Sequence, residues 1–270
     1  MSDPKPLFTL YPGTQPLLVS LPHVGTYLPE ALRPKLVERA RLVEDTDWHL
    51  DQLYDFVRVL GASLLVPKTS RLMVDLNRPP ENAPMYPGAN NTELCPTRFF
   101  TGEPIYRPGQ APDEAEVQAR LASHWQPYHA ALRAELARLQ AEHGHVVLFD
   151  GHSIRSELPW LFDGRLPNLN LGTASGASCA PGLRTALMSV LAGQSAFSHV
   201  TDGRFKGGYI TRHYGRPALG VHAVQLEMTW DSYMDEAPPW VWRPERAAGA
   251  LPVLRALVNT MLTWRPEDSE

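Results

Sequence analysis

The sequence predicts an α/β protein of three layers, in which a mixed, mostly parallel β-sheet carries helices on both faces. Two observations support this fold class. Short apolar runs with abrupt polar ends alternate along the chain with amphipathic segments at helical spacing. The apolar runs are continuous, as is typical of strands that are buried on both faces. Strands that alternate with helices favour a single sheet covered on either side.

The strand candidates are short runs made mainly of Leu, Val and Ala that stop abruptly at polar residues. They cover residues 17–23, 62–67, 72–76, 145–150 and 218–227. Each run has the length of an ordinary strand and is too short for a typical helix. We therefore expect all five to pair in the sheet.

Helices are expected between these runs. In residues 45–60, apolar side chains recur at helical spacing, and Gly61 marks the end. Residues 113–143 form a longer amphipathic segment, in which Pro127 should introduce a kink or a break. Two further helices are predicted at residues 183–191 and 246–262.

The chain is expected to form a single domain over residues 1–270, with long loops at about residues 77–112 and 163–181. The first loop is rich in Pro, Asn and Gly. Connections of this length in a compact domain usually serve a function. We therefore expect these loops to border the active site.

Composition excludes several classes of protein. The net charge of -4 lacks the basic excess of a nucleic-acid-binding protein. No apolar run approaches the roughly 18 residues of a membrane span, and the N-terminus lacks a signal-peptide pattern. The two cysteines cannot form a disulfide framework. These features predict a cytoplasmic protein without nucleic-acid or membrane partners, and they leave its oligomeric state open.

Three strand candidates end in residues suited to metal binding or acid–base chemistry. The first ends at His23, the fourth runs into His152, and the fifth ends at Glu227. Ligands in open α/β sheets bind outside the carboxyl ends of the strands, and charged groups are rarely buried without a partner. Two histidines and one carboxylate form a typical catalytic zinc site. His23 and His152 are the natural histidine pair, and Glu227 suits a general base or acid.

The third metal ligand should be an acidic residue from a nearby element. Asp47 lies on the same face of the predicted helix as the buried Leu50 and should point inward. Asp51, one turn further on, is the alternative ligand. His49 points about 200° away from Asp47 and is less suitable. Asp150 is expected to support a ligand rather than to bind the metal directly.

Arginines close to the expected site indicate an anionic ligand. Arg71 and Arg78 flank the third strand candidate, and Asn77 falls at its carboxyl end. Residues 201–215 are rich in glycine, which allows the backbone to approach a ligand closely. This segment contains Arg204, Lys206 and Arg212. Arginine is the residue for bidentate recognition of carboxylates, although each of these positions also suits a solvated basic turn.

Taken together, the motifs resemble the N-formylglutamate amidohydrolase (N-formylglutamate deformylase) family. The matching stretches are residues 20–25, 45–51, 70–71 with 74–79, 148–155, 203–215 and 225–227. The resemblance implies a fold like that of zinc carboxypeptidases, of the phosphorylase/hydrolase type, and of aspartoacylases. It also implies hydrolysis of N-formyl-L-glutamate to formate and L-glutamate, in histidine degradation.

The resemblance assigns roles to individual residues. It implies one zinc ion on His23, Asp47 and His152, with Glu227 as the base that takes a proton from the attacking water. The arginines would hold the carboxylates of a small anionic amino-acid derivative and stabilise the oxyanion. The implied substrate-binding residues are Arg71, Asn77, Arg78 and Arg212.

Three other functions remain open at this point. One is a related zinc N-acyl amino-acid deacylase or carboxypeptidase. Another is a protein of this fold that binds a ligand without catalysis. The third is a metal-free hydrolase with Cys95 as nucleophile, which lacks an obvious His/Asn partner motif.

Overall fold

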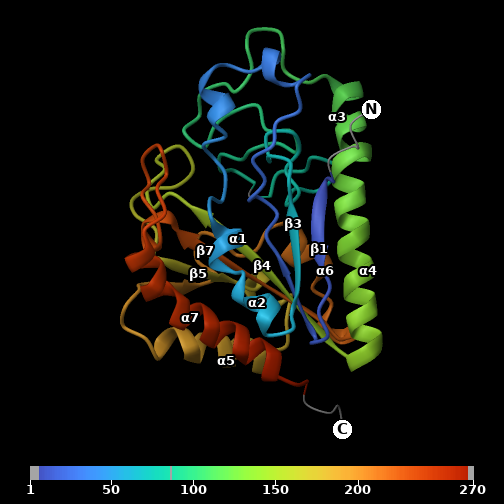
Figure 1. Ribbon diagram of the computed structural model, residues 1–270, viewed down its shortest axis with the longest axis vertical. Coiled ribbons are helices and arrows are strands. Elements are labelled where there is room, and N and C mark those ends of the chain that lie inside the picture. The colour runs from blue at the N-terminus through green and yellow to red at the C-terminus, as the bar shows by residue number, and fades with distance from the viewer. Residues whose placement is uncertain (1–5, 86, 267–270) are drawn as a thin grey trace.

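The computed structural model describes residues 6–85 and 87–266, and it places a seven-stranded sheet at the centre of the chain (Figure 1). The strand order is β1-β3-β2-β4-β7-β5-β6. The strands are β1 (Phe8–Tyr11), β2 (Leu17–Ser20), β3 (Ser63–Pro67), β4 (Val146–Ile154), β5 (Leu169–Gly172), β6 (His199–Thr201) and β7 (Val221–Thr229). The central strands β3, β2, β4 and β7 are parallel, whereas β1 and β5 pair antiparallel with β3 and β7. The predicted mixed, mostly parallel sheet is therefore confirmed.

Helices cover both faces of this sheet, as predicted (Figure 1). They are α1 (Leu50–Leu53), α2 (Phe56–Val59), α3 (Glu114–Arg120), α4 (Gln126–His143), α5 (Pro181–Ala192), α6 (Tyr209–Tyr214) and α7 (Pro244–Thr263). One apolar core packs α4 and α6 on the sheet, and a second packs α1, α2, α5 and α7 on the opposite face. Among the described residues, no helix combines the length and the hydrophobicity needed to cross a bilayer.

The prediction of a strand at residues 72–76 is wrong. The segment forms turns, in which Met73 N donates to Ser70 O and Asp75 N donates to Leu94 O. Val74 is buried because it packs in the core beneath α4 and not because it pairs in the sheet. Burial alone produced the strand-like pattern here.

Residues 45–60 do not form the single helix that the spacing predicts. Two short helices, α1 and α2, replace it, and Asp47 lies in the turn that precedes them. His49 interrupts the segment, because it has a left-handed backbone with φ of 61°. The break expected at Pro127 is confirmed, since a π-helical turn (Leu121–Trp125) comes directly before α4.

The loop of residues 77–112 lies above the carboxyl ends of the central strands in Figure 1. In the described part of residues 77–112, the backbone forms turns and isolated bridges, such as the one between Arg98 and Pro104. Residues 163–181 contain the short strand β5, which the sequence did not predict. The strands β1 and β6 were also missed, because each is short and only partly buried.

Candidate active site

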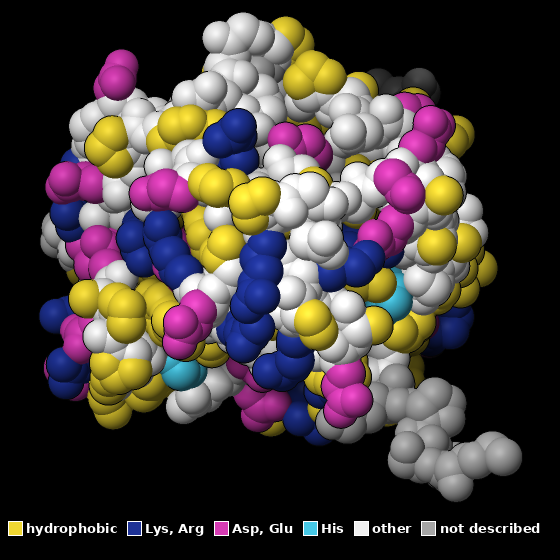
Figure 2. Space-filling model, turned by 90° about the horizontal axis from the view of Figure 1, so that it is seen from above, with side chains coloured by type: hydrophobic (Ala, Val, Ile, Leu, Met, Phe, Trp, Pro, Cys, Tyr) yellow, Lys and Arg dark blue, Asp and Glu magenta, His cyan; other side chains and the backbone are white. Residues whose placement is uncertain are grey.

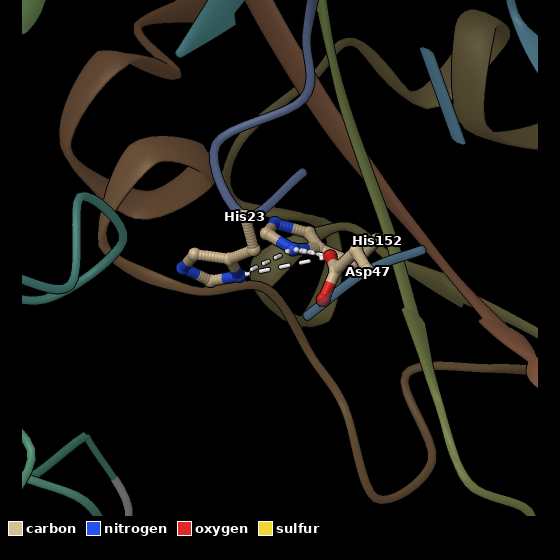
Figure 3. Close-up of side chains that lie close together, drawn as sticks. All are labelled: His23, Asp47 and His152. Carbon is tan, nitrogen blue, oxygen red and sulfur yellow. Dashed lines mark hydrogen bonds and ion pairs between the residues drawn. The ribbon is translucent and has the colours of Figure 1, made fainter. Parts of the chain in front are cut away.

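A cluster of three potential metal ligands lies at the carboxyl end of the parallel strands. His23 follows β2, His152 lies near the end of β4, and Asp47 comes from the turn before α1. Their ligand atoms all lie within 4.8 Å of one another, and all three residues are buried. Figure 3 shows both imidazole rings close to the carboxylate of Asp47. The pairing of β2 with β4 explains why the two histidines meet.

The hydrogen bonds of the two rings suit a divalent cation. His23 Nε2 lies 2.7 Å from Asp75 Oδ1, and His152 Nε2 lies 2.9 Å from Asp150 Oδ2. If each Nε2 donates its proton to a carboxylate, each Nδ1 carries a lone pair. His152 Nδ1 lies 3.1 Å from His23 Nδ1 and 3.2 Å from Asp47 Oδ2. Two lone pairs and a carboxylate oxygen therefore converge, which is the usual ligand set of a metal centre with supporting carboxylates.

The electrostatics of the cluster favour a positive charge. Burial alone would lower the pKa of His152, but the carboxylates of Asp150 and Asp47 raise it well above its usual value. Burial opposes ionisation of Asp47 as well, yet hydrogen bonds from His152 and His23 lower its pKa below the usual range. The site therefore stabilises a cation, which either a proton or a divalent metal ion supplies.

Asp47 is held in place from three directions. Its backbone N donates to His23 O at 3.1 Å, and its Oδ2 accepts from Ser153 N at 3.2 Å. The hydroxyl of Tyr233 donates to Trp48 O at 2.9 Å, which fixes the next residue in the chain. The turn thus places Asp47 against both histidines without the helix that the sequence analysis assumed.

The two alternatives to Asp47 point elsewhere. Asp51 is exposed in the first turn of α1, where its Oδ1 accepts from Gln52 N. His49 Nε2 lies 2.8 Å from Trp240 O. The structure therefore brings Asp47 to the histidines and keeps Asp51 and His49 away from them.

Glu227 lies beside the cluster on the neighbouring strand. In the parallel pair of β4 and β7, Glu227 stands in register with His152, so that the two side chains project from the same face. Glu227 is buried, and burial raises the pKa of its carboxyl to about 8. Gln225 Nε2 lies 3.4 Å from Glu227 Oε2. Among the described residues, no basic side chain forms an ion pair with this carboxyl group, and a metal ion on the neighbouring cluster would favour its ionised form, which can act as a base.

Arg71 and Arg78 occupy different positions beside the cluster. Arg71 is buried, and its Nη2 donates to Asp75 Oδ2 at 2.5 Å while Nη1 lies 3.8 Å from Asp47 Oδ1. Arg78 is less buried and donates from Nε and Nη2 to Thr92. Arg71 is thus paired with carboxylates near the potential metal ligands, whereas the loop holds Arg78 at the side of the cavity.

Asn77 is the most tightly held of the predicted substrate-binding residues. Its Nδ2 donates to Asp150 Oδ2 at 3.1 Å, and its Oδ1 accepts from Ile210 N at 2.7 Å. A Cβ atom added to Gly208 would lie 2.3 Å from Asn77 Nδ2. Only glycine at position 208 therefore allows the segment before α6 to approach this amide so closely.

The cavity above the cluster has a volume of about 620 Å³, including its open mouth. Every predicted site residue lines it except Arg212, which is exposed and donates from Nε to Gly207 O at 2.8 Å. Figure 2 views the molecule from above and shows several basic side chains near the middle of this face. A direct role for Arg212 in substrate binding stays a prediction.

Other residues of the site received no role in the sequence analysis. Asp75 binds His23, Arg71 and the backbone N of Asn77, which links the turn of residues 71–78 to the metal ligands. Gln225 lines the cavity two residues before Glu227, and the alternation of side chains along a strand is the signal that would have found it.

Cys95 is buried in the core beneath α4 and does not line this cavity. Burial raises the pKa of its thiol to about 11. The thiol is therefore protonated at neutral pH, which opposes a role as nucleophile.

The chain is similar to known proteins along most of its length. The model of the N-formylglutamate amidohydrolase family matches residues 15–234. A protein named N-formylglutamate deformylase from Pseudomonas putida is 49% identical over 261 residues, 97% of each chain. Another of that name from Pseudomonas aeruginosa is 51% identical over 255 residues, 94% of this chain and 96% of the relative. The crystal structure of N-formylglutamate amidohydrolase from Ralstonia eutropha JMP134 has a TM-score of 0.77 at 27% identity, covering 94% of this chain and 95% of that one.

Two buried histidines and an aspartate lie at the carboxyl ends of the central strands, and a glutamate stands in register with one of the histidines. This fold and site define a hydrolase with a potential metal centre. The family match covers well over half of the chain, and both relatives share about half of its residues. The chain belongs to the N-formylglutamate amidohydrolase family.

Proposed function

We propose that this protein hydrolyses N-formyl-L-glutamate to formate and L-glutamate with the help of one zinc ion. The observation that carries the proposal is the register of Glu227 with His152, which sets a buried base beside three potential metal ligands. The names of the two Pseudomonas relatives and the family match support this choice of substrate. The predicted cytoplasmic location and the place in histidine degradation remain predictions.

His23, Asp47 and His152 would hold the zinc ion, with Asp75 and Asp150 orienting the two rings. Zinc bound by three protein ligands polarises a carbonyl oxygen and lowers the pKa of a water molecule. The supporting carboxylates fix the ring orientations and make the ligand nitrogens more basic. This donor set fits zinc better than magnesium, which prefers oxygen ligands.

Glu227 moves the proton in the proposed reaction. Its carboxylate takes a proton from the attacking water as the water oxygen bonds to the formyl carbon. It then delivers this proton to the amide nitrogen as the C–N bond breaks, which releases formate and the amine of glutamate. Burial raises the pKa of Glu227 to about 8, so that the residue can hold the proton between the two steps.

The arginines supply the positive charge that the substrate and the transition state require. Arg71 lies closest to the metal ligands, and we infer that it stabilises the oxyanion that forms at the formyl carbon. Asn77 and Arg78 line the cavity next to this point and suit the α-carboxylate of the substrate.

Formate release from N-formyl-L-glutamate tests the proposal. The purified protein should release formate and glutamate in equal amounts, and it should act far more slowly on N-acetyl-L-glutamate and on peptides. Equal or faster release of acetate, or of a C-terminal amino acid, would replace the proposal by a deacylase or a carboxypeptidase. The absence of any hydrolysis would favour a ligand-binding protein.

A further inference from the structure

The segment of residues 202–208 is anchored at both ends and passes over the edge of the cavity. At its start, Asp202 Oδ1 accepts from Thr173 N at 2.7 Å. At its end, Gly208 N donates to Gln225 Oε1 at 2.7 Å. Because the sheet region fixes both ends, the side chains between them are presented to the cavity in a defined position.

Two side chains of this segment, Arg204 and Phe205, line the cavity. Arg204 Nη2 donates to Leu161 O at 3.1 Å, and its guanidinium carbon lies 5.3 Å from the centre of the Phe205 ring. The Phe205 ring in turn packs edge to face on Phe162 at 6.1 Å. A carbonyl and an aromatic face hold a guanidinium in place without neutralising its charge. Both contacts therefore orient a positive charge at the cavity wall.

Arg78 is linked to the potential metal ligands through a single residue, Asp75. Arg78 Nη1 lies 3.9 Å from Asp75 Oδ2, and Asp75 is bonded directly to His23. Arg204 contacts Leu161 and Phe205, which belong to the loops around the cavity. Of these two arginines, Arg78 is thus the one linked to the potential metal ligands, whereas Arg204 lies towards the loops that surround the cavity.

The two carboxylates of the substrate also lie at different distances from the bond that is hydrolysed. The α-carboxylate of N-formylglutamate lies next to the scissile amide, whereas the second carboxylate lies at the far end of the side chain. The geometry points to Arg204 as the residue that binds the side-chain carboxylate and thereby selects a glutamate side chain over a neutral one of the same length. This inference rests on the proposed function and specifies which arginine reads which end of the substrate.

The test compares N-formyl-L-glutamate with N-formyl-L-glutamine, which has the same length and a neutral end. We expect the wild-type protein to prefer the glutamate compound by about 100-fold or more in kcat/KM. In Arg204→Met, kcat/KM for N-formyl-L-glutamate should fall by about 100-fold, and that for N-formyl-L-glutamine should change by less than about threefold. Arg204→Lys should lose about tenfold on the glutamate compound alone, because lysine keeps the charge and lacks the planar fork.

The matched control is Arg41→Met, which removes an exposed arginine that does not line the cavity and should leave both rates unchanged. Zinc content and melting temperature identify a variant that has failed to fold, in which case Arg204→Lys carries the test. Equal losses on both substrates, or an unchanged preference in the Arg204 variants, would overturn the inference while the proposed function stands. Failure of the wild-type protein to release formate would overturn the proposed function and this inference together.

Discussion

Asp150→Asn should weaken the affinity of the protein for zinc without removing any metal ligand. Asp150 is fully buried, and its Oδ2 lies 2.9 Å from His152 Nε2 and 3.1 Å from Asn77 Nδ2. The substitution replaces a hydrogen bond to a charged group, worth about 1.5–3 kcal/mol, by a neutral one worth about 0.5–1.5 kcal/mol. The lost basicity of the ring adds to this difference, and we expect the Kd for zinc to rise by about 10–100-fold, or about 1.4–2.7 kcal/mol.

Competition with a chelator of known affinity measures the Kd for zinc of the wild-type and variant proteins. Asp51→Asn is the control, because Asp51 is exposed on α1 and should not contribute to the site. Saturating zinc should restore most of the formate release of Asp150→Asn. A Kd within about twofold of the wild-type value would refute the role assigned to Asp150. A loss of zinc affinity in Asp51→Asn would refute the choice of Asp47 as the acidic ligand.

Three further predictions concern catalysis, packing and pH. Glu227→Gln should retain its zinc and lower kcat by about 10²–10⁴-fold, and a rate within tenfold of wild type would exclude Glu227 as the base. Gly208→Ala should push a Cβ against Asn77, which would lower kcat/KM about tenfold and the free energy of unfolding by about 1–3 kcal/mol; unchanged values in formate-release and urea-unfolding assays would contradict this. Burial lowers the pKa of His222 to about 4, so the folded state keeps this ring neutral at pH values where the unfolded chain is already protonated. Its contribution to stability should be complete above about pH 6.5 and lost towards pH 4, at about 1.4 kcal/mol per pH unit. His222→Gln should show a shallower pH dependence of urea unfolding, and an unchanged slope would count against this account.

The central strands could be predicted because their residues are apolar on both faces. The runs that became β2, β3, β4 and β7 pack against helices above and below the sheet, and a continuous apolar sequence records this directly. Residues 72–76 show the limit of this signal, because Val74 is buried in a turn that packs on the core. The antiparallel strands β1 and β5 were missed, since short strands of this kind leave little periodic pattern.

Asp47 lies beside both histidines as expected, although the local structure that led to this expectation was wrong. Helical geometry placed Asp47 on the inward face beside Leu50, yet the residue belongs to a turn that a left-handed His49 separates from α1. Asp47 is nevertheless buried, because its carboxylate accepts hydrogen bonds from β4 and contacts both histidines. The expectation that Asp47 points inward was therefore sufficient to place it in the site, although the helix on which the expectation rested does not form.

The sequence alone could not show which arginine of residues 201–215 lines the cavity. Arg204 and Arg212 lie among the same glycines, and both match what an anion-binding loop would contain. Only the start of α6 at Tyr209 separates them, because it leaves Arg204 on the cavity wall and turns Arg212 to the surface. The different positions of Arg204 and Arg212 result from the tertiary contact of Gly208, which no local sequence pattern predicts.

Formate release with and without zinc is the most direct test of the proposed function. The protein is stripped with a chelator, assayed with N-formyl-L-glutamate, and assayed again after one equivalent of zinc has been added. We expect the stripped protein to release no formate, and zinc to restore the release of formate and glutamate in equal amounts. Full activity in protein shown to contain no metal, or no hydrolysis after zinc has rebound, would contradict the account.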